Sequence, residues 1–434
     1  MQRLLLILPS ATYRAPDFIA AARELGVAVT VASDRAAAMS VAMGNRALTL
    51  HSSDAREAAE AIVARARETP FAAIVGVDEE GVMAAALAAE RLGLRHNPPL
   101  AVERTRDKAA MRRALADADV PQPRFVVLTA DSDPRAAAGE IGFPCVIKPL
   151  SLSGSRGVIR AEDPDQADTA AARVRRILAA THPTVDPTLL IESYLPGVEV
   201  AVEGLLHDGQ LQLLAIFDKP DALEGPYFEE TLYVTPSRLP ADVTAEIERT
   251  TAQAARALGL REGPIHAELR VDGNHVSVLE LAARSIGGLC SRALRFGVGV
   301  SLEQLILRHA LGREMQDLAP ETAAAGVMML PIRRAGKLLA VDGQAKARAV
   351  NGINGLHITI ARGRQLVPLP DGDRYLGFLF ANAPTPEAVE ASLREAHAHL
   401  HVRIEPPATR PRRDPATTAR ANRGDEPRRR NPTR

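Results

Sequence analysis

The chain has 434 residues but only two cysteines, Cys145 and Cys290. Two cysteines exclude a disulfide framework and a cysteine-based zinc site, and they fit a reducing compartment. No apolar run approaches the roughly 20 residues that a membrane-spanning helix needs. The apolar run before Pro9 is also too short for a signal peptide. We therefore expect a cytoplasmic protein with no membrane partner.

An excess of charge of one sign is also missing. Lys plus Arg and Asp plus Glu both number 53, so net charge gives no argument for nucleic-acid binding. The balance conceals one uneven segment, because residues 410–434 carry nine arginines against three acids. Residues 406–434 are rich in Pro and Arg and have no apolar periodicity, which predicts a disordered tail. This tail could bind nucleic acid or an acidic partner, or it could have no function.

The first 95 residues alternate short apolar runs with Ala-rich helical patterns. This alternation predicts βαβ units and a parallel sheet. The expected strands are 4–8, 27–33 and 71–77, and the expected helices are 17–26 and 81–93. No G-x-G-x-x-G motif follows the first strand, which argues against a dinucleotide site there.

Beyond about residue 100 the pattern changes to strands joined by turns, with a few long helices. The expected helices are 107–118, 163–180, 241–258, 301–312 and 386–400. Ser301 and Gln304 predict a capping box at the start of one of them. The fold class that these patterns predict is an α/β domain followed by α+β domains.

The segment CVIKPLSLSGSRGV places Lys148 at the end of an apolar run and follows it with a Ser/Gly-rich loop. In the common phosphate motif the lysine follows the glycines and opens a helix. Here the lysine comes first and a strand-like GVIR follows, so we expect a β-hairpin flap over a phosphate. Glycines allow close backbone approach, hydroxyls add donors, and lysine supplies a point charge. The flap residues are Ser151, Ser153, Gly154, Ser155, Arg156 and Gly157. A surface hairpin with a glycine turn is the alternative.

The segment HAELRVDGNHVSVLELAAR predicts a second hairpin, which carries two glutamates. If Asp272–Asn274 form a three-residue turn, Glu280 lies opposite His266. Glu268 and Glu280 are then diagonal neighbours on one face, roughly 7–8 Å apart. Two such carboxylates can hold Mg²⁺ together with substrate phosphates. A four-residue turn would put them on opposite faces, and a surface hairpin with solvated charges is the alternative.

Together these segments resemble the ATP-grasp superfamily, and within it the carboxylate–amine ligases of the L-amino-acid ligase-like branch. The resemblance covers roughly residues 1–405 and rests on the ordered motifs RDKAAMRRAL, GFPCVIKPLSLSGSRGV, LLIESYLPGVEVAVEGLL, FDKPDALEGPYFEETLYVTPSRLP and HAELRVDGNHVSVLELAARSIGGLC. It implies a Rossmann-like pre-ATP-grasp domain, a two-lobed ATP-grasp domain and a C-terminal α+β lid domain. The expected boundaries are 1–100, 101–320 (lobes of about 101–188 and 189–320), 321–405, and the tail 406–434.

The resemblance also implies which residues bind the nucleotide. Lys108 and Lys148 would touch it, Lys148 at the phosphates, and the 151–157 loop would close over the β- and γ-phosphates. The residues implied at the adenine and ribose are Glu192, Tyr194, Leu195 and Glu199.

For the metal, the resemblance implies that Glu268 and Glu280 ligate Mg²⁺ or Mn²⁺. Arg284 would stabilise the transferring phosphoryl group, with Lys148 as its catalytic partner. Many family members read E-x-N-x-R at the last motif, with the Asn as a further ligand, whereas this chain has Ala282 there. The second metal would then be held by the two glutamates and ATP oxygens alone, or bound weakly.

The activity implied is an ATP-dependent joining of a small-molecule carboxylate to an amine through an acyl phosphate, with an amino acid as one substrate. A glutamate in the pocket could bind an α-amino group, although a mobile loop with solvated acids is the alternative. The candidate substrate residues are Lys219, Tyr227, Glu229, Glu230, Arg284, Gly287 and Gly288. Two other functions stay open, namely another ATP-grasp enzyme of carboxylase or purine-pathway type, and a non-catalytic nucleotide-binding regulator. Family members are often dimers, so a homodimer is also open.

Overall fold

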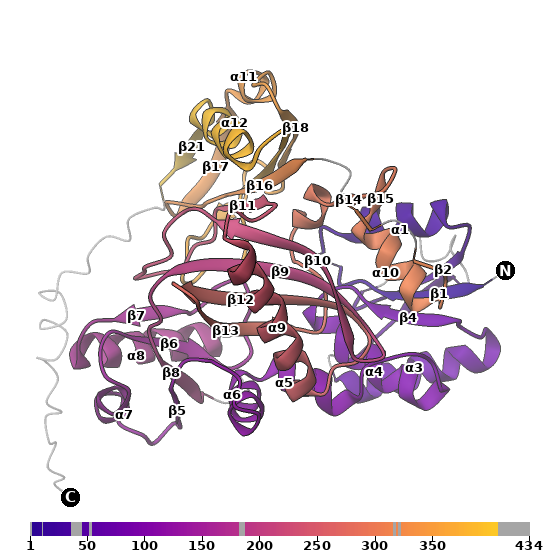
Figure 1. Ribbon diagram of the computed structural model, residues 1–434, viewed down its shortest axis with the longest axis horizontal. Coiled ribbons are helices and arrows are strands. Elements are labelled where there is room, and N and C mark those ends of the chain that lie inside the picture. Colours follow the sequence, from indigo (N-terminus) through magenta and orange to yellow (C-terminus); the bar gives the residue numbers. More distant parts are fainter. Residues whose placement is uncertain are drawn as a thin grey trace, which may run out of the picture.

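The computed structural model describes residues 2–10, 12–35, 46–51, 54–181, 187–315, 318–319 and 323–406. The predicted disordered tail therefore lies almost entirely outside the described residues. In Figure 1 the N-terminal domain, the small sheet of β5–β8 and the C-terminal strands with α12 surround one large central sheet. Within the part of the chain that is described, each helix is too short or too polar to cross a bilayer.

The N-terminal domain is a parallel sheet in the order β3-β2-β1-β4. Its elements are β1 (Arg3–Ile7), α1 (Ala15–Glu24), β2 (Ala28–Ser33), β3 (Ala47–Thr49), α3 (Ala55–Glu68), β4 (Ala73–Gly76) and α4 (Glu79–Leu92). Leu4 and Leu6 pack with α1, whereas Leu5 and Ile7 pack with α3 and α4. Because both faces of the sheet are covered, β1 is apolar and buried from Leu4 to Ile7. The predicted parallel sheet is confirmed.

The small lobe is an antiparallel sheet in the order β5-β8-β6-β7, with α8 packed on β6 and β7. The elements of this region are α5 (Pro99–Arg106), α6 (Lys108–Asp117), β5 (Phe125–Leu128), α7 (Pro134–Ile141), β6 (Cys145–Pro149), β7 (Ile159–Ala161), α8 (Pro164–Thr181) and β8 (Leu189–Ser193). Strands β6 and β7 pair antiparallel and are joined by residues 150–158. The flap that follows Lys148 is therefore a hairpin connection, as predicted, and not a helix N-terminus.

The large sheet has eight strands in the order β13-β12-β9-β10-β11-β16-β20-β18. They are β9 (Val198–His207), β10 (Gln210–Lys219), β11 (Leu232–Thr235), β12 (Gly263–Asp272), β13 (His275–Ala282), β16 (Ala324–Leu330), β18 (Ile353–Ile358) and β20 (Gly377–Ala383). Helix α9 (Ala241–Leu258) packs on the end of the sheet formed by β13, β12, β9 and β10. Since β11 pairs with β16, the sheet continues through the domain boundary expected near residue 320.

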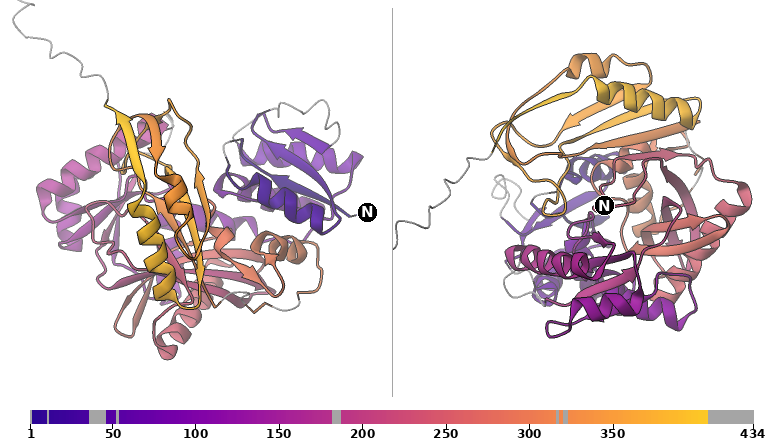
Figure 2. Two further views of the ribbon diagram at one scale, coloured as in Figure 1. Left: turned by 90° about the horizontal axis from the view of Figure 1, so that it is seen from above. Right: turned by 90° about the vertical axis from the view of Figure 1, so that its left-hand side faces the viewer.

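The C-terminal part forms one end of the large sheet through β16, β20 and β18, and Figure 2 shows it beside both the small lobe and the N-terminal domain. Its remaining elements are β17 (Gly336–Asp342), α11 (Gln344–Arg348), β19 (Gln365–Leu366), α12 (Pro386–Ala398) and β21 (His401–Glu405). Between the large sheet's two halves, the chain passes through η2 (Cys290–Ala293), β14 (Arg295–Phe296), β15 (Val300–Ser301) and α10 (Leu302–Ala310). The predicted Ser301–Gln304 capping box is present at the start of α10.

The register predicted for the carboxylate hairpin is wrong in two respects. Asp272 pairs with His275, so the turn contains two residues, and His266 pairs with Ala282 rather than with Glu280. A two-residue turn alone would place the two glutamates on opposite faces. A β-bulge between Glu268 and Leu269 shifts the register by one residue, so Glu268 lies directly opposite Glu280. The carboxylates share a face because of this bulge.

Candidate active site

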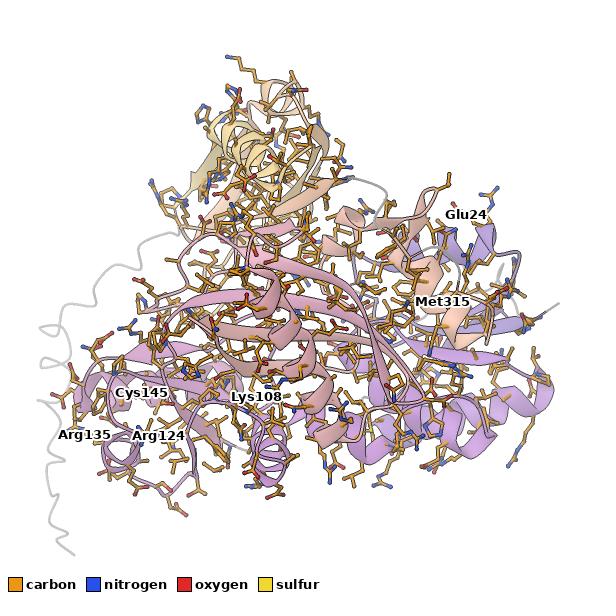
Figure 3. All side chains as sticks on the ribbon, viewed as in Figure 1. Glu24, Lys108, Arg124, Arg135, Cys145 and Met315 are labelled. Carbon is orange, nitrogen blue, oxygen red and sulfur yellow. The ribbon has the colours of Figure 1, made fainter. Side chains whose placement is uncertain are left out.

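The small lobe, the large sheet and the loops after β1 and β4 line a cavity of about 690 Å³. Most residues predicted for the site line it, from elements far apart in the sequence. These are Lys108, Lys148, Ser151, Ser153, Gly154, Ser155, Arg156, Glu192, Tyr194, Leu195, Glu199, Glu230, Glu268, Glu280, Arg284, Gly287 and Gly288. In Figure 3 Lys108 lies between the small lobe and the large sheet, whereas Cys145 lies within the small lobe. The predicted lining residues that are not part of the wall are Gly157, Lys219, Tyr227 and Glu229.

A buried charge network holds Lys148 at the small-lobe end of the cavity. Its Nζ lies 2.7 Å from Glu192 Oε2, and Arg112 Nε donates to Glu192 Oε1 at 2.6 Å. Burial acts to raise the pKa of Glu192, but Arg112 and Lys148 together hold it below its usual value. Burial, with Arg112 and Lys108 nearby, lowers the pKa of Lys148. Both Glu192 oxygens are therefore engaged by cations, and an adenine contact through this carboxylate would have to compete with them.

The flap folds over the same end. Ser155 has φ 56°, which L residues seldom adopt, and Gly154 and Gly157 also have positive φ. Lys108 Nζ donates to the Leu152 carbonyl at 2.9 Å and to Glu280 Oε1 at 3.2 Å, so it joins the flap to the carboxylate hairpin. Gly157 does not line the cavity, and its N–H donates to the Pro370 carbonyl at 3.0 Å. The absence of a side chain at Gly157 instead allows close packing, since an added Cβ would lie 3.3 Å from the Pro149 ring.

The pair Glu268 and Glu280 supplies hard oxygen donors on one face of the hairpin. Glu268 lies 3.5 Å from His266 and 3.6 Å from Lys219, and Glu280 faces Lys108. Both side chains are partly exposed to the cavity. Two opposed carboxylates open to a cavity fit Mg²⁺ or Mn²⁺, which prefer oxygen ligands. Ala282 lines the same cavity and offers no ligand.

A second charge cluster lies beside Glu268. Lys219 is buried and contacts Glu199 at 2.6 Å and also Glu230, so it supports the wall from behind rather than lining it. Burial opposes a charged lysine, but Glu199 and Glu230 raise the pKa of Lys219. Burial raises the pKa of Glu230 to about 7, and its Oε1 accepts from the Tyr233 hydroxyl at 2.8 Å. Lys219 thus lies among three acids, and Arg270 beside Glu199 and His266 beside Glu268 add further positive charge to the cluster.

His266 is held by a buried carboxylate. Its Nδ1 lies 2.5 Å from Glu203 Oε1, and both Glu203 oxygens also accept from the Ile286 N–H at 3.1 Å. Burial acts to lower the pKa of His266, but Glu203 raises it to about 9. The imidazole is therefore protonated at neutral pH and stabilises the Glu268 carboxylate beside it. Sequence reasoning left His266 without a firm role.

Residues of the N-terminal domain form another part of the cavity wall. The sequence did not indicate this contribution. Arg284 Nε donates to Glu79 Oε2 at 3.0 Å, and Arg14 donates to Ser285 Oγ at 2.6 Å. Arg14 follows β1 and Glu79 follows β4, which are the two strands at the switch point of the parallel sheet. Ligands of open α/β sheets bind at such points. That rule is the only signal that could have found these residues.

Two residues predicted to bind substrate point elsewhere. The Tyr227 hydroxyl accepts from Arg173 at 2.9 Å, and Glu229 accepts from the Ile332 N–H at 3.3 Å. Neither residue lines the cavity, although Glu230 at the end of the same 220–230 loop does, and a substrate role for Tyr227 and Glu229 stays a prediction. The C-terminal segment lines the cavity in their place, through Asp373, Arg374, Tyr375 and Phe378.

Another cluster of titratable groups, His207, Glu262 and His309, lies away from this cavity. Arg95 Nη1 lies 2.7 Å from His207 Nδ1 and 3.4 Å from Glu262 Oε2, so a guanidinium already supplies the cation at its centre. Burial and Arg95 lower the pKa of His309 to about 4. This cluster therefore serves stability rather than metal binding.

His309 should make folding sensitive to acid. Its pKa is depressed in the folded chain, so its contribution is complete above the unfolded value of 6.5 and is lost as the pH falls toward 4. We expect the unfolding free energy to fall by up to about 3 kcal/mol over that interval through this group. Urea unfolding of wild type and His309→Gln across this range checks it, with the exposed His401→Gln as control. Parallel pH curves for wild type and His309→Gln would contradict it.

Three family models match separate parts of the chain. They describe an ATP-grasp N-terminal domain over residues 19–96, an ATP-grasp domain over residues 141–293, and an L-amino acid ligase C-terminal domain 2 over residues 328–405. A curated relative, alanine–anticapsin ligase of Bacillus subtilis, is 31% identical over 274 residues, which is 59% of this chain and 57% of that protein. The chain thus matches little more than half the length of that relative.

Several solved structures are similar over 93% of this chain, and two of them follow. The L-amino acid ligase from Bacillus licheniformis has a TM-score of 0.74 at 24% identity, with 99% of it covered. The biotin carboxylase domain of Hydrogenobacter thermophilus 2-oxoglutarate carboxylase, in complex with MgADP, ADP and bicarbonate, has a TM-score of 0.68 at 17% identity, with 91% covered. At these identities the likeness shows a shared fold, and the fold hosts more than one reaction.

Proposed function

We propose that this chain, which belongs to the ATP-grasp superfamily, is an ATP-dependent carboxylate–amine ligase that forms an amide or peptide bond. One observation carries the proposal. A single cavity brings Lys148 and the flap together with Glu268, Glu280 and Arg284, and it continues to Glu230. Cations for phosphate, carboxylates for a metal and a site for a second substrate thus lie within one enclosure.

The nucleotide would lie between the small lobe and the large sheet. Lys108, Lys148 and the flap N–H groups would bind its phosphates, with the Tyr194–Leu195 backbone at the adenine and Glu199 at the ribose. Glu199 already contacts Lys219 and Arg270, so it would be a fixed acceptor. When bound by Glu268 and Glu280, Mg²⁺ or Mn²⁺ would neutralise charge on the transferring phosphate.

The reaction has two steps. A carboxylate oxygen of the first substrate attacks the γ-phosphorus, the bond to the β-phosphate oxygen breaks, and ADP and an acyl phosphate form. The amine of the second substrate then attacks the acyl carbon, phosphate leaves, and the amine proton passes to phosphate or solvent. Phosphoryl transfer needs positioning and charge stabilisation rather than a protein nucleophile. Arg284, fixed by Glu79, and Lys148, fixed by Glu192, meet that need.

The end of the cavity near Glu230, called the substrate end below, has features that favour an amino acid as substrate. Glu230 is a carboxylate with a fixed orientation, held by Tyr233 and Lys219, and it can accept a bond from an ammonium group. Tyr13, Tyr375 and Phe378 form edge-to-face ring contacts around the same end, which suits an organic side chain. A bicarbonate substrate, as in the carboxylase of similar fold, would use neither feature.

The purified protein with MgATP should release ADP and phosphate only when an amino acid or a pair of amino acids is present. The product mass should equal that of the two substrates minus one water. Single and paired amino acids would be screened for ADP release, and mass spectrometry would identify the product. A Lys148→Ala variant serves as control for contaminating ATPases. Release with bicarbonate alone would support the carboxylase alternative, and tight ATP binding with no release for any pair would support a regulator.

A further inference from the structure

A loop of the C-terminal part lies directly on the flap. This loop, residues 367–375, connects β19 to β20. The Pro370 carbonyl accepts from the Gly157 N–H at 3.0 Å, and the Asp371 carbonyl accepts from Arg156 Nε at 3.0 Å. The flap and this loop are more than 200 residues apart in the sequence, so the contact exists only in the folded chain.

The Asp371 side chain extends the contact to the helix behind the flap. Its Oδ2 lies 2.6 Å from Nη2 of Arg173 on α8. Arg173 Nη1 in turn donates to the Tyr227 hydroxyl at 2.9 Å. Asp371 therefore joins three segments, which are the flap through its backbone, α8 through its carboxylate, and the 220–230 loop through Arg173.

The flap has few bonds of its own. Within it, Arg156 N–H donates to Ser153 at 3.4 Å and Val158 N–H donates to Ser155 at 3.2 Å, and both distances are long. Its firm contacts with the rest of the protein are those with Lys108 and with the 367–375 loop. The closed position of the flap thus depends on a loop that belongs to another part of the molecule.

The same loop also reaches the substrate end. Asp373, Arg374 and Tyr375 line the cavity, and the Tyr375 ring contacts Phe378 edge-on. Residues two to four positions after Asp371 therefore touch the space where the substrates would bind. A substrate that orders this segment would also fix Asp371 against the flap.

We propose that Asp371 is a positioning residue that latches the flap over the phosphates and couples flap closure to occupancy of the substrate end. Its carboxylate holds Arg173, and this ion pair fixes the backbone carbonyls of Pro370 and Asp371 that accept from the flap. Asp371 touches no reacting atom. This inference rests on the proposed function, because the latch is useful only if an acyl phosphate must be protected from water. The contact itself can be tested without any activity.

The test compares Asp371→Ala with Asp342→Ala by hydrogen exchange of residues 150–158. Asp342 is a matched control, because it forms a similar ion pair, with Arg403 at 2.7 Å, whose two residues both belong to the C-terminal part. We expect flap exchange to be about two- to fivefold faster in Asp371→Ala, the effect of one partly exposed ion pair, and unchanged in Asp342→Ala. Asp371→Arg should have a larger effect, since it places a cation beside Arg156 and Arg173. Adding Arg173→Asp to that variant should restore protection.

Exchange is measured without nucleotide and with Mg²⁺ and a non-hydrolysable ATP analogue. Equal flap exchange in wild type and Asp371→Ala in both conditions would overturn the latch. Faster exchange in Asp371→Ala, with no binding of the analogue to wild type, would support the latch contact but contradict the proposed function. In active enzyme the latch variant should also release more ADP per amide formed, at unchanged melting temperature. An unchanged ratio of ADP to amide would exclude the coupling to catalysis.

Discussion

Replacing Glu280 by glutamine should lower MgATP-dependent ADP release by roughly 10²–10³-fold, the usual cost of removing one electrostatic stabiliser. Glu280 is one of two carboxylates that share a face of the β12–β13 hairpin, and Lys108 lies 3.2 Å from it. Glutamine keeps the shape and an oxygen that Lys108 can reach, so the fold should survive. The negative charge that would hold the metal is lost.

The measurement is the initial rate of ADP release at several Mg²⁺ concentrations. Higher Mg²⁺ should recover part of the lost rate in the variant if the charge serves the metal. Glu246→Gln is the matched control, because that glutamate pairs with Arg249 on the exposed face of α9. A variant that keeps its full rate would remove Glu280 from the metal site. Full biological activity with no turnover would point to the regulator instead.

Glu192→Gln should lower the free energy of unfolding by about 3–5 kcal/mol, the range for breaking a buried ion pair from one side. The glutamate is buried and shared by Arg112 and Lys148. Removing its charge leaves two almost fully buried cations without their shared counter-ion. Because the pKa of Glu192 is held below its usual value, its contribution is present at neutral pH and is lost only as the pH falls through that lowered value.

Urea unfolding at neutral pH measures this loss, with Glu246→Gln again as the surface control. The variant should also bind the ATP analogue more weakly, because Lys148 loses the partner that keeps it charged and in place. A loss of stability below about 1 kcal/mol, the range of an exposed pair, would mean that the network is more solvated than its burial in the structure implies.

The sequence predicted the parts of the site that depend on local patterns. The flap was predictable because a lysine at a strand end, a Ser/Gly loop and a second strand are adjacent in the chain. The α10 capping box was predictable because Ser301 and Gln304 bond within one helical turn. The carboxylate hairpin was predictable as a pair of strands, but its register was not, because the bulge beside Glu268 leaves no mark in the residue alternation.

The sequence by itself determined many of the element types, the βαβ start and the two glutamates that the β12–β13 hairpin carries. Only the tertiary structure decided that Arg14 and Glu79 reach that cavity, that Glu192 is shared by two cations, and that Asp371 contacts the flap. The physical reason is the separation along the chain over which each kind of interaction acts. Backbone propensity, capping and strand alternation act over a few residues, whereas these contacts join side chains that meet only after sheets and helices have packed.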